Sequence, residues 1–172
     1  MTRPTRERFP MHRKWLICAW LAMLLTASTV AAQQPPVGGA PDMAPSYGAP
    51  ITLAQAKRMA AAVEAAAAKD QDDSYVLAIV QPNGELVYFE KADDSTYISI
   101  EWAQAKARMA ALYRSPSGNL PPGGGTLPAA MPLPGGLPIV YQGKTIGAIG
   151  ISGAERGGDV GLAQTGIAAL RH

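Results

Sequence analysis

Two β-hairpin signals that alternate with helical runs constrain the fold of this chain more than any other feature of its sequence. The first hairpin is predicted over residues 75–90, with its tight turn at Asn83-Gly84, where positive φ angles are needed. The second is predicted over residues 138–151, with its turn at Gln142-Gly143. The first strand, Val76–Val80, is apolar throughout, which indicates a central strand covered on both faces.

Three runs with helical periodicity surround these hairpins. The first, over residues 53–69, follows the capping-box sequence Thr52-Leu-Ala-Gln55. The second covers about residues 96–113, and the third runs from Asp159, as its cap, to Leu170. Five residues of the second run share one face: Ile98, Trp102, Ala105, Met109 and Leu112. Helices interleaved with hairpins predict an α+β fold, a single three-layer domain in which helices flank a mostly antiparallel sheet of about five strands.

The first 32 residues have the pattern of a secretory signal peptide. Basic residues precede an apolar run from Leu16 to Val30, and the run ends in Val30-Ala31-Ala32, which a signal peptidase accepts. The run holds about 15 residues, fewer than the roughly 20 that span a bilayer as a helix. We therefore expect cleavage and a periplasmic or secreted protein without stable membrane insertion. Retention of the leader (residues 1–32) as an anchor is the alternative.

The remainder of the chain divides into a tether and a domain. Residues 33–50 are rich in proline, glycine and alanine, which predicts a flexible tether before a domain over residues 51–172. Without the leader the chain keeps ten of its 15 basic residues and 12 of its 13 acids. This mildly acidic balance gives no case for nucleic-acid binding, which uses clustered basic side chains. The single cysteine, Cys18, lies in the leader, which excludes thiol nucleophiles from the mature domain.

Histidine is nearly absent, and this favours binding over catalysis. His12 lies in the leader and His172 is the last residue, so the predicted core offers no histidine for a triad, a zinc site or proton transfer. The stretch Gly147–Gly153 has the spacing of a phosphate-binding loop, but it lacks the Lys-Ser/Thr ending of a P-loop. No catalytic residue is predicted, and whether the protein is an enzyme stays open.

Several of these features form an ordered set across residues 51–171. They are Val76–Val80 with Asn83-Gly84, Lys91-Ala-Asp93, Ser99–Ala107, Gly135–Ile139, and Gly147–Gly153 with Asp159. In this order they resemble the GlcG/HbpS family of haem-binding-like proteins, which is also similar to the C-terminal domain of PduO-type corrinoid adenosyltransferases. The resemblance implies a profilin-like, GlcG-like domain that assembles into homo-oligomers. It also implies a small-molecule ligand such as haem or another tetrapyrrole.

The resemblance points to residues that would bind such a ligand. Lys91 and Lys106 would pair with the carboxylates of a flat anion, and the glycine-rich last strand would admit its ring. The predicted ligand-binding residues are Lys91, Asp93, Lys106, Gly135, Gly136, Gly150, Ser152, Gly153 and Asp159. Candidate haem axial ligands are Met109, Met131 and Tyr113, since methionine and tyrosine both ligate haem iron. Two alternatives remain: an enzyme or accessory subunit in the oxidation of haem or a small acid, and a non-catalytic oligomeric interaction module.

Overall fold

The computed structural model describes residues 44–120, 132–155 and 158–171. Its helices are α1 (Leu53–Asp70), α2 (Tyr97–Tyr113), the 3₁₀ turn η1 (Ser117–Asn119) and α3 (Asp159–Ala168). Its strands are β1 (Val76–Val80), β2 (Leu86–Lys91), β3 (Gly136–Tyr141) and β4 (Lys144–Ser152). The predicted signal peptide and most of the predicted tether lie outside the described residues. No helix in the described part of the chain is long and apolar enough to cross a membrane.

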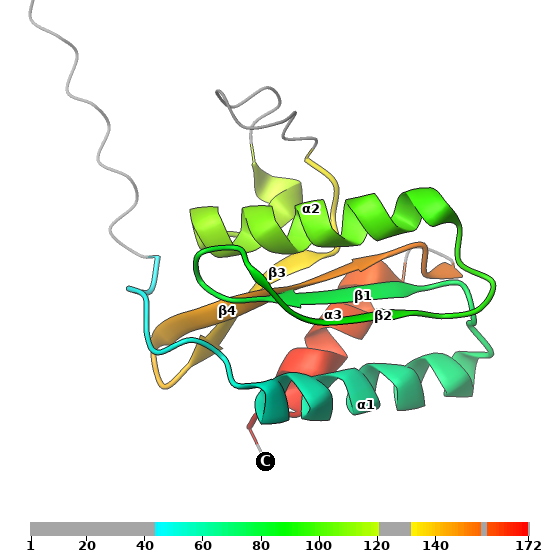
Figure 1. The fold of residues 1–172 in the computed structure, drawn as a ribbon, viewed down its shortest axis with the longest axis horizontal. Helices are drawn as coiled ribbons and strands as arrows, with labels where there is room; N and C mark the ends of the chain where they lie inside the picture. Colours follow the sequence, from blue (N-terminus) through cyan, green and yellow to red (C-terminus); the bar gives the residue numbers. More distant parts are fainter. Residues whose placement is uncertain (1–43, 121–131, 156–157, 172) are drawn as a thin grey trace, which may run out of the picture. The chain divides into compact units, whose positions relative to one another are not determined.

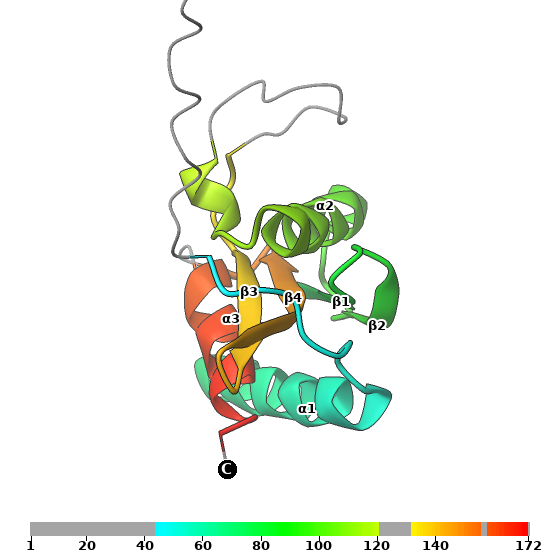
Figure 2. The ribbon, with the colours of Figure 1, turned by 90° about the vertical axis from the view of Figure 1, so that its left-hand side faces the viewer.

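The four strands form one antiparallel sheet in the order β2-β1-β4-β3 (Figure 1). Helix α2 covers one face of the sheet, and α1 and α3 cover the other (Figure 2). The three-layer α+β architecture predicted from the sequence is therefore confirmed. Among the described residues the sheet has four strands instead of about five.

The central strand β1 contributes to two apolar cores, as its unbroken apolar sequence predicts. Leu77 and Ile79 pack with α1 and α3 in the larger core, which also holds Met59. Val76, Ala78 and Val80 point to the opposite face, where they pack against the alanines of α2. Alternate residues of a strand point to opposite faces, so an all-apolar strand fits only between two covering layers.

Helix α2 packs on the sheet through the face opposite to the one that its large apolar residues define. Ile98 is 51% exposed and Trp102 39% exposed, although their spacing suggested a core-facing stripe. The buried residues of α2 are instead Ser99, Ala103, Lys106, Ala107, Ala110 and Ala111. Apart from Lys106, the residues of this packing face have small side chains in common, and large apolar side chains are absent from it.

The glycines of β3 and β4 explain this choice of face. A Cβ on Gly150 would lie 2.1 Å from the Ala103 carbonyl oxygen, and one on Gly136 would lie 2.3 Å from the Lys106 carbonyl oxygen. The α2 backbone therefore rests directly on the two strands. Apart from Lys106, whose ammonium reaches the end of β4, the side chains in this close interface are small, and the bulky apolar residues of α2 lie on its outer side.

The two hairpin turns differ in their backbone angles. Gln142 and Gly143 both have positive φ, 48° and 73°, as a two-residue turn between β3 and β4 requires. In the first hairpin only Gly84 has positive φ, 84°, whereas Asn83 keeps an ordinary negative value. The prediction for Asn83 was wrong because its side-chain oxygen accepts a hydrogen bond from the Glu85 N–H (3.1 Å), which completes a local turn instead.

Residues 44–50, which we call the strap, are bound to the domain although the sequence predicted a flexible tether there. The strap runs beside the start of β4 before α1 begins (Figure 1). The Thr145 N–H donates to the Ser46 carbonyl (2.9 Å), and the Gly48 N–H donates to the Thr145 carbonyl (2.9 Å). The Tyr47 hydroxyl lies within hydrogen-bonding distance of the Ala111 and Leu112 carbonyls at the end of α2, at 3.1 and 3.0 Å. The folded unit thus extends at least to residue 44.

Candidate functional site

Lys106 is buried, with 6% of its surface exposed, and its ammonium has three hydrogen-bond partners within the domain. Its Nζ donates to the Ile151 carbonyl (2.9 Å) and to Ser152 Oγ (3.3 Å), both on β4. It also forms an ion pair with Asp159 Oδ2 at 2.7 Å. An ammonium has three protons, so these contacts leave none for a ligand.

Asp159, the anionic partner of Lys106, is the first residue of α3. The sequence predicted that Asp159 caps the helix, but the N-cap is Gly158 and no side-chain cap bond forms there. The second carboxylate oxygen, Oδ1, instead accepts from the Ala154 N–H (3.0 Å). The cap prediction was wrong because the carboxylate is held by Lys106 and by the chain that leaves β4.

Glycines surround this ion pair, and the backbone packs so closely there that no free space remains. A Cβ on Gly135 would lie 2.5 Å from the Ile151 carbonyl oxygen and 3.2 Å from Lys106 Nζ. Gly136 and Gly150 lie against the α2 backbone in the same way. Where not even a methyl group fits, a flat ring does not fit between these elements. The contacts of Lys106 and Asp159 hold α2, β4 and α3 together. A ligand-binding role for these residues remains a prediction.

Three other predicted residues lie away from the Lys106–Asp159 ion pair. Gly153 has a φ of 91° and packs beside Ser99 at the N-terminal end of α2. Lys91 donates to the Ala92 and Asp93 carbonyls (2.9 and 3.0 Å), and its Nζ lies 5.8 Å from the centre of the Tyr97 ring. The structure therefore brings together Lys106, Gly135, Gly136, Gly150, Ser152 and Asp159, but places Lys91 and Asp93 in a separate turn.

The candidate axial ligands do not converge on a site. Met109 is half-buried on α2 and Tyr113 is 40% exposed at its end. Met131 lies outside the described residues. Within the described ranges, no group of three or more histidine, cysteine or carboxylate side chains is arranged to hold a metal ion.

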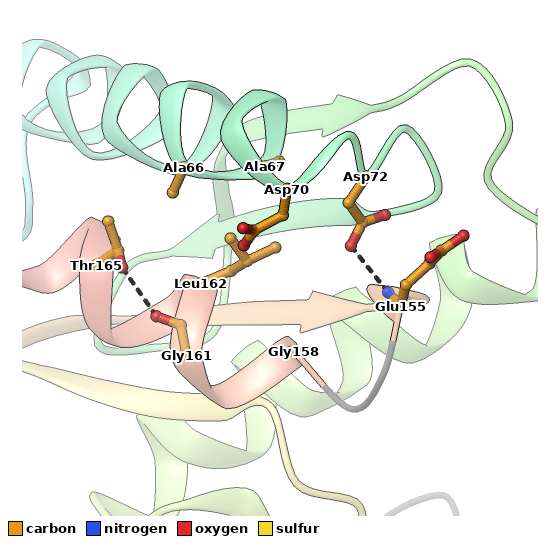
Figure 3. A pocket seen from close by; sticks show the side chains of 9 residues that line it. All are labelled: Ala66, Ala67, Asp70, Asp72, Glu155, Gly158, Gly161, Leu162 and Thr165. Carbon is orange, nitrogen blue, oxygen red and sulfur yellow. Dashed lines mark hydrogen bonds between the residues drawn. The ribbon is translucent and has the colours of Figure 1, made fainter.

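A hollow of about 420 Å³ separates the end of α1 from the start of α3 (Figure 3). Asp70, Asp72 and Glu155 line it together with Leu162 and Thr165. The Asp72 carboxylate accepts from the Ser74 hydroxyl (2.7 Å), the Ser74 N–H (3.0 Å) and the Glu155 N–H (2.8 Å). Burial alone would raise the pKa of Asp72, but these three hydrogen bonds outweigh it and hold the pKa below its usual value.

A second acidic hollow, of about 530 Å³, lies on the other side of the end of α1, beside β1 and β2. Tyr75 and Tyr88 donate to the two oxygens of the Glu90 carboxylate, at 2.7 and 2.9 Å. Burial and the Glu90 carboxylate raise the pKa of Tyr75, while the hydrogen bond to Glu90 is the main cause of the raised pKa of Tyr88. The acids that line this hollow are Glu64, Asp72, Asp73, Glu90, Asp93 and Asp94. Both hollows are therefore suited to cations and unfavourable for anions.

A third hollow, which we call the strap hollow, has the opposite character. It measures about 640 Å³ and lies between the strap, the start of α1 and the β3–β4 hairpin. Tyr47, Tyr141, Lys144 and Ile146 line it, with no carboxylate among its described lining residues. Sequence reasoning missed this hollow because it assigned Tyr47 to a tether. The one available signal was the Tyr-Gln-Gly-Lys turn, which sets an aromatic ring and a base on either side of a hairpin tip.

Comparison with known proteins identifies the family. A family model described as "Haem degrading protein HbpS-like" matches residues 51–168. The chain belongs to the HbpS-like family. Its curated relatives include a 15.0 kDa protein of Citrobacter freundii encoded between dhaT and dhaS, 32% identical over 130 residues, which are 69% of this chain and 91% of that protein. Protein GlcG of Escherichia coli K12 is 33% identical over 106 residues, which are 56% of this chain and 79% of GlcG.

Solved structures of HbpS and of two other proteins share the fold. A crystal structure of HbpS has a TM-score of 0.66 and 30% identity, and the match covers 74% of this chain and 94% of HbpS. Klebsiella pneumoniae protein ORFY has a TM-score of 0.65 and 26% identity, over 73% of this chain and 94% of ORFY. A crystal structure of a PduOC–haem complex has a TM-score of 0.61 and 25% identity, over 70% of this chain and 94% of PduOC.

Proposed function

We propose that this chain is exported and that its mature domain binds haem or a related tetrapyrrole, for sequestration or sensing. The observation that carries the proposal is the match of residues 51–168 to the HbpS-like family. A neighbour of the same fold whose structure contains haem supports the choice of ligand class. The strap hollow supports it as well, because its size and charge suit a flat anion.

The direct test is a haem titration of the chain from Gln33 to His172, followed by absorbance. Saturation at one haem per chain or per dimer is the expected result. Drift of the spectrum without saturation, as free haem gives, would remove the support for haem as the ligand. The same titration with iron-free protoporphyrin separates recognition of the ring from ligation of the metal.

An enzymatic role in haem oxidation is the second candidate, and the description of the matching family as haem degrading favours it. Under this alternative the protein consumes its ligand when a reductant is supplied. Incubation of the haem-loaded protein with ascorbate in air distinguishes the two roles. Stable absorbance supports binding alone, and loss of absorbance faster than in a protein-free control supports turnover.

The proposal of export rests on residues 1–32, whose charged start and apolar run are typical of a signal peptide. Expression of the full chain in a Gram-negative host, followed by fractionation and mass measurement, tests it. A periplasmic protein that begins at Gln33 is the expected product. A full-length protein in the membrane fraction would support the alternative of an anchor.

We also propose that the outer face of α2 binds a second copy of the chain. Ile98 and Trp102 are exposed there, and Glu101 and Arg108 lie on either side of Ala105 on the same face. In an antiparallel α2 pair centred on Ala105, each Glu101 would face Arg108 of the partner subunit, so the surface is complementary to itself. A small residue at the centre permits close approach of the two helices.

Light scattering during gel filtration tests this arrangement. Ala105→Arg should give a monomer, whereas Ala65→Arg on the exposed side of α1 should leave the oligomer unchanged. Glu101→Arg and Arg108→Glu should each weaken association, and the double variant should restore it, because both charges reverse together. If Ala105→Arg assembles as the wild type does, the contact lies elsewhere.

A further inference from the structure

We propose that the strap hollow is the place where a flat anionic ring binds, with the Tyr141 hydroxyl as the ligand of a haem iron and Lys144 as the partner of a carboxylate. This inference rests on the proposed function, since it assigns a site to the proposed ligand. It differs from the site expected from the sequence, where Lys106 was to pair with the ligand.

The hollows of the domain differ in the charge of the residues that line them. A tetrapyrrole such as haem carries two carboxylates, and a site lined by acids repels them. The hollow in Figure 3 has three carboxylates among its described lining residues and its neighbour beside Tyr75 has six, and no basic side chain is among the described lining residues of either. A hollow between α2 and the β1–β2 hairpin has Arg108, but Glu85 and Glu101 line it too. Each of these three hollows therefore disfavours a dianion.

Two further hollows have no carboxylate among their described lining residues, and of these two the strap hollow offers chemistry for haem. The hollow between β3 and α3 is lined by Arg171, Gln164 and aliphatic side chains. Its described lining includes neither an aromatic ring nor a group that commonly ligates iron. The strap hollow combines two tyrosines with Lys144, and its volume of about 640 Å³ is the larger of the two. This volume falls within the roughly 300–1,000 Å³ of small-molecule sites.

The two tyrosines of the strap hollow have different roles. The Tyr47 hydroxyl is held at the end of α2 by the Ala111 and Leu112 carbonyls, and the Arg114 guanidinium lies 5.1 Å from the centre of its ring. Its ring can therefore contact a ligand while its hydroxyl cannot turn toward one. Tyr141 is 36% exposed, and its hydroxyl has no hydrogen-bond partner in the part of the chain that the structure describes. Tyr141 is thus the tyrosine that remains available to iron.

Lys144 is available to a carboxylate in the same hollow. Among the described residues its ammonium donates one side-chain hydrogen bond, to Ser46 Oγ (3.1 Å), which uses one of three ammonium protons. When the Tyr141 oxygen binds ferric iron, its proton passes to water and no electron is transferred. The remaining negative charge of the ligand then lies on its carboxylates, where Lys144 can pair with it.

The experiment is a ferric haem titration of the chain from Gln33 to His172, compared with Tyr141→Phe and Lys144→Gln. Tyr141→Phe keeps the ring and removes the oxygen, so we expect at least about a tenfold rise in Kd and loss of the phenolate-to-iron charge-transfer band. Lys144→Gln should raise Kd about threefold and reduce its dependence on salt, as expected for an exposed ion pair. Tyr97→Phe and Lys69→Gln are matched controls at exposed positions on other surfaces and should stay within twofold of the wild type.

The outcomes separate this inference from the proposed function. Saturable binding by the wild type that neither Tyr141→Phe nor Lys144→Gln changes would overturn the strap hollow as the site and leave haem binding intact. No saturable binding by the wild type would overturn both. Circular dichroism and the thermal midpoint of each variant should match the wild type, because both substituted side chains lie at an exposed hairpin tip.

Discussion

Lys106 and Asp159 are 53 residues apart in the sequence, and Lys106 Nζ lies 2.7 Å from Asp159 Oδ2. The pair joins the buried face of α2 to the first residue of α3, two helices on opposite sides of the sheet. Ser152 Oγ and the Ile151 carbonyl at the end of β4 complete the contact. One charged side chain thus ties all three layers at one end of the domain.

Removing either member of this pair should destabilise the domain. Lys106→Met leaves the half-buried Asp159 carboxylate without its cation, and Asp159→Asn leaves a buried ammonium without its anion. We expect each to lower the free energy of unfolding by about 3 kcal/mol, as for broken buried ion pairs. Urea unfolding of both single variants and the double variant should show a coupling of about 1–3 kcal/mol. Losses below about 0.5 kcal/mol would mean that the pair behaves as a surface salt bridge.

Two glycines make a matched pair for testing the close contact of α2 with the sheet. A Cβ on Gly150 would lie 2.1 Å from the Ala103 carbonyl oxygen, so Gly150→Ala should cost about 3 kcal/mol of unfolding free energy or more. Nothing lies within 4 Å of a Cβ on Gly161 in α3, so Gly161→Ala should stabilise by about 0.5–1 kcal/mol through helix propensity. Equal effects of the two substitutions would contradict the direct contact of α2 with β4.

The sequence predicts those parts of this fold that depend on local signals. The capping box at Thr52 and Gln55 forms as expected, with the Thr52 N–H donating to Gln55 Oε1 (2.9 Å) and the Gln55 N–H donating to Thr52 Oγ1 (3.2 Å). Residues 142–143 make the expected tight turn, and β1 is the expected central strand. Each of these features needs only residues near it in the chain, so its signal is complete in the local sequence.

Features that depend on distant contacts were predicted less well. The buried face of α2 follows from glycines on β3 and β4, which periodicity within the helix does not reveal. Asp159 has the form of a helix cap, but its carboxylate goes to Lys106, a partner that only the tertiary fold supplies. The strap has the composition of a flexible tether and is held by β4 and by the end of α2. In each case a long-range partner overrides the local preference.

Asp72 should make the stability of the domain depend on pH in the acid range. Its pKa lies below the usual value in the folded state, so its contribution is present above the unfolded pKa and is lost as the pH falls through the folded pKa. Asp72→Asn should cost about 1–2 kcal/mol at pH 7, and the difference from the wild type should shrink below about pH 4. Asp70→Asn is the control and should cost nothing, because an exposed acid at the end of α1 opposes the helix dipole. Thermal unfolding at pH 7, 5 and 3 measures both, and a constant Asp72→Asn difference down to pH 3 would contradict the assignment.

The strap should stabilise the start of β4. There β4 extends beyond the end of β1 and has no neighbouring strand on that side. The β1 ladder on β4 ends at Ala148, so the Thr145 N–H has no strand partner there and donates instead to Ser46. A chain that begins at Ile51 should therefore exchange the Thr145 amide proton faster than one that begins at Ala44, because only the longer chain covers that N–H. We expect the shorter chain to lose about 2 kcal/mol of unfolding free energy, since several hydrogen bonds worth about 1 kcal/mol each are partly offset by the entropy of ordering the strap.

Tyr47→Phe in the longer chain isolates one contact, the hydroxyl at the end of α2, and should cost about 1 kcal/mol. Equal exchange of the Thr145 amide in the two chains would mean that water replaces the strap without loss.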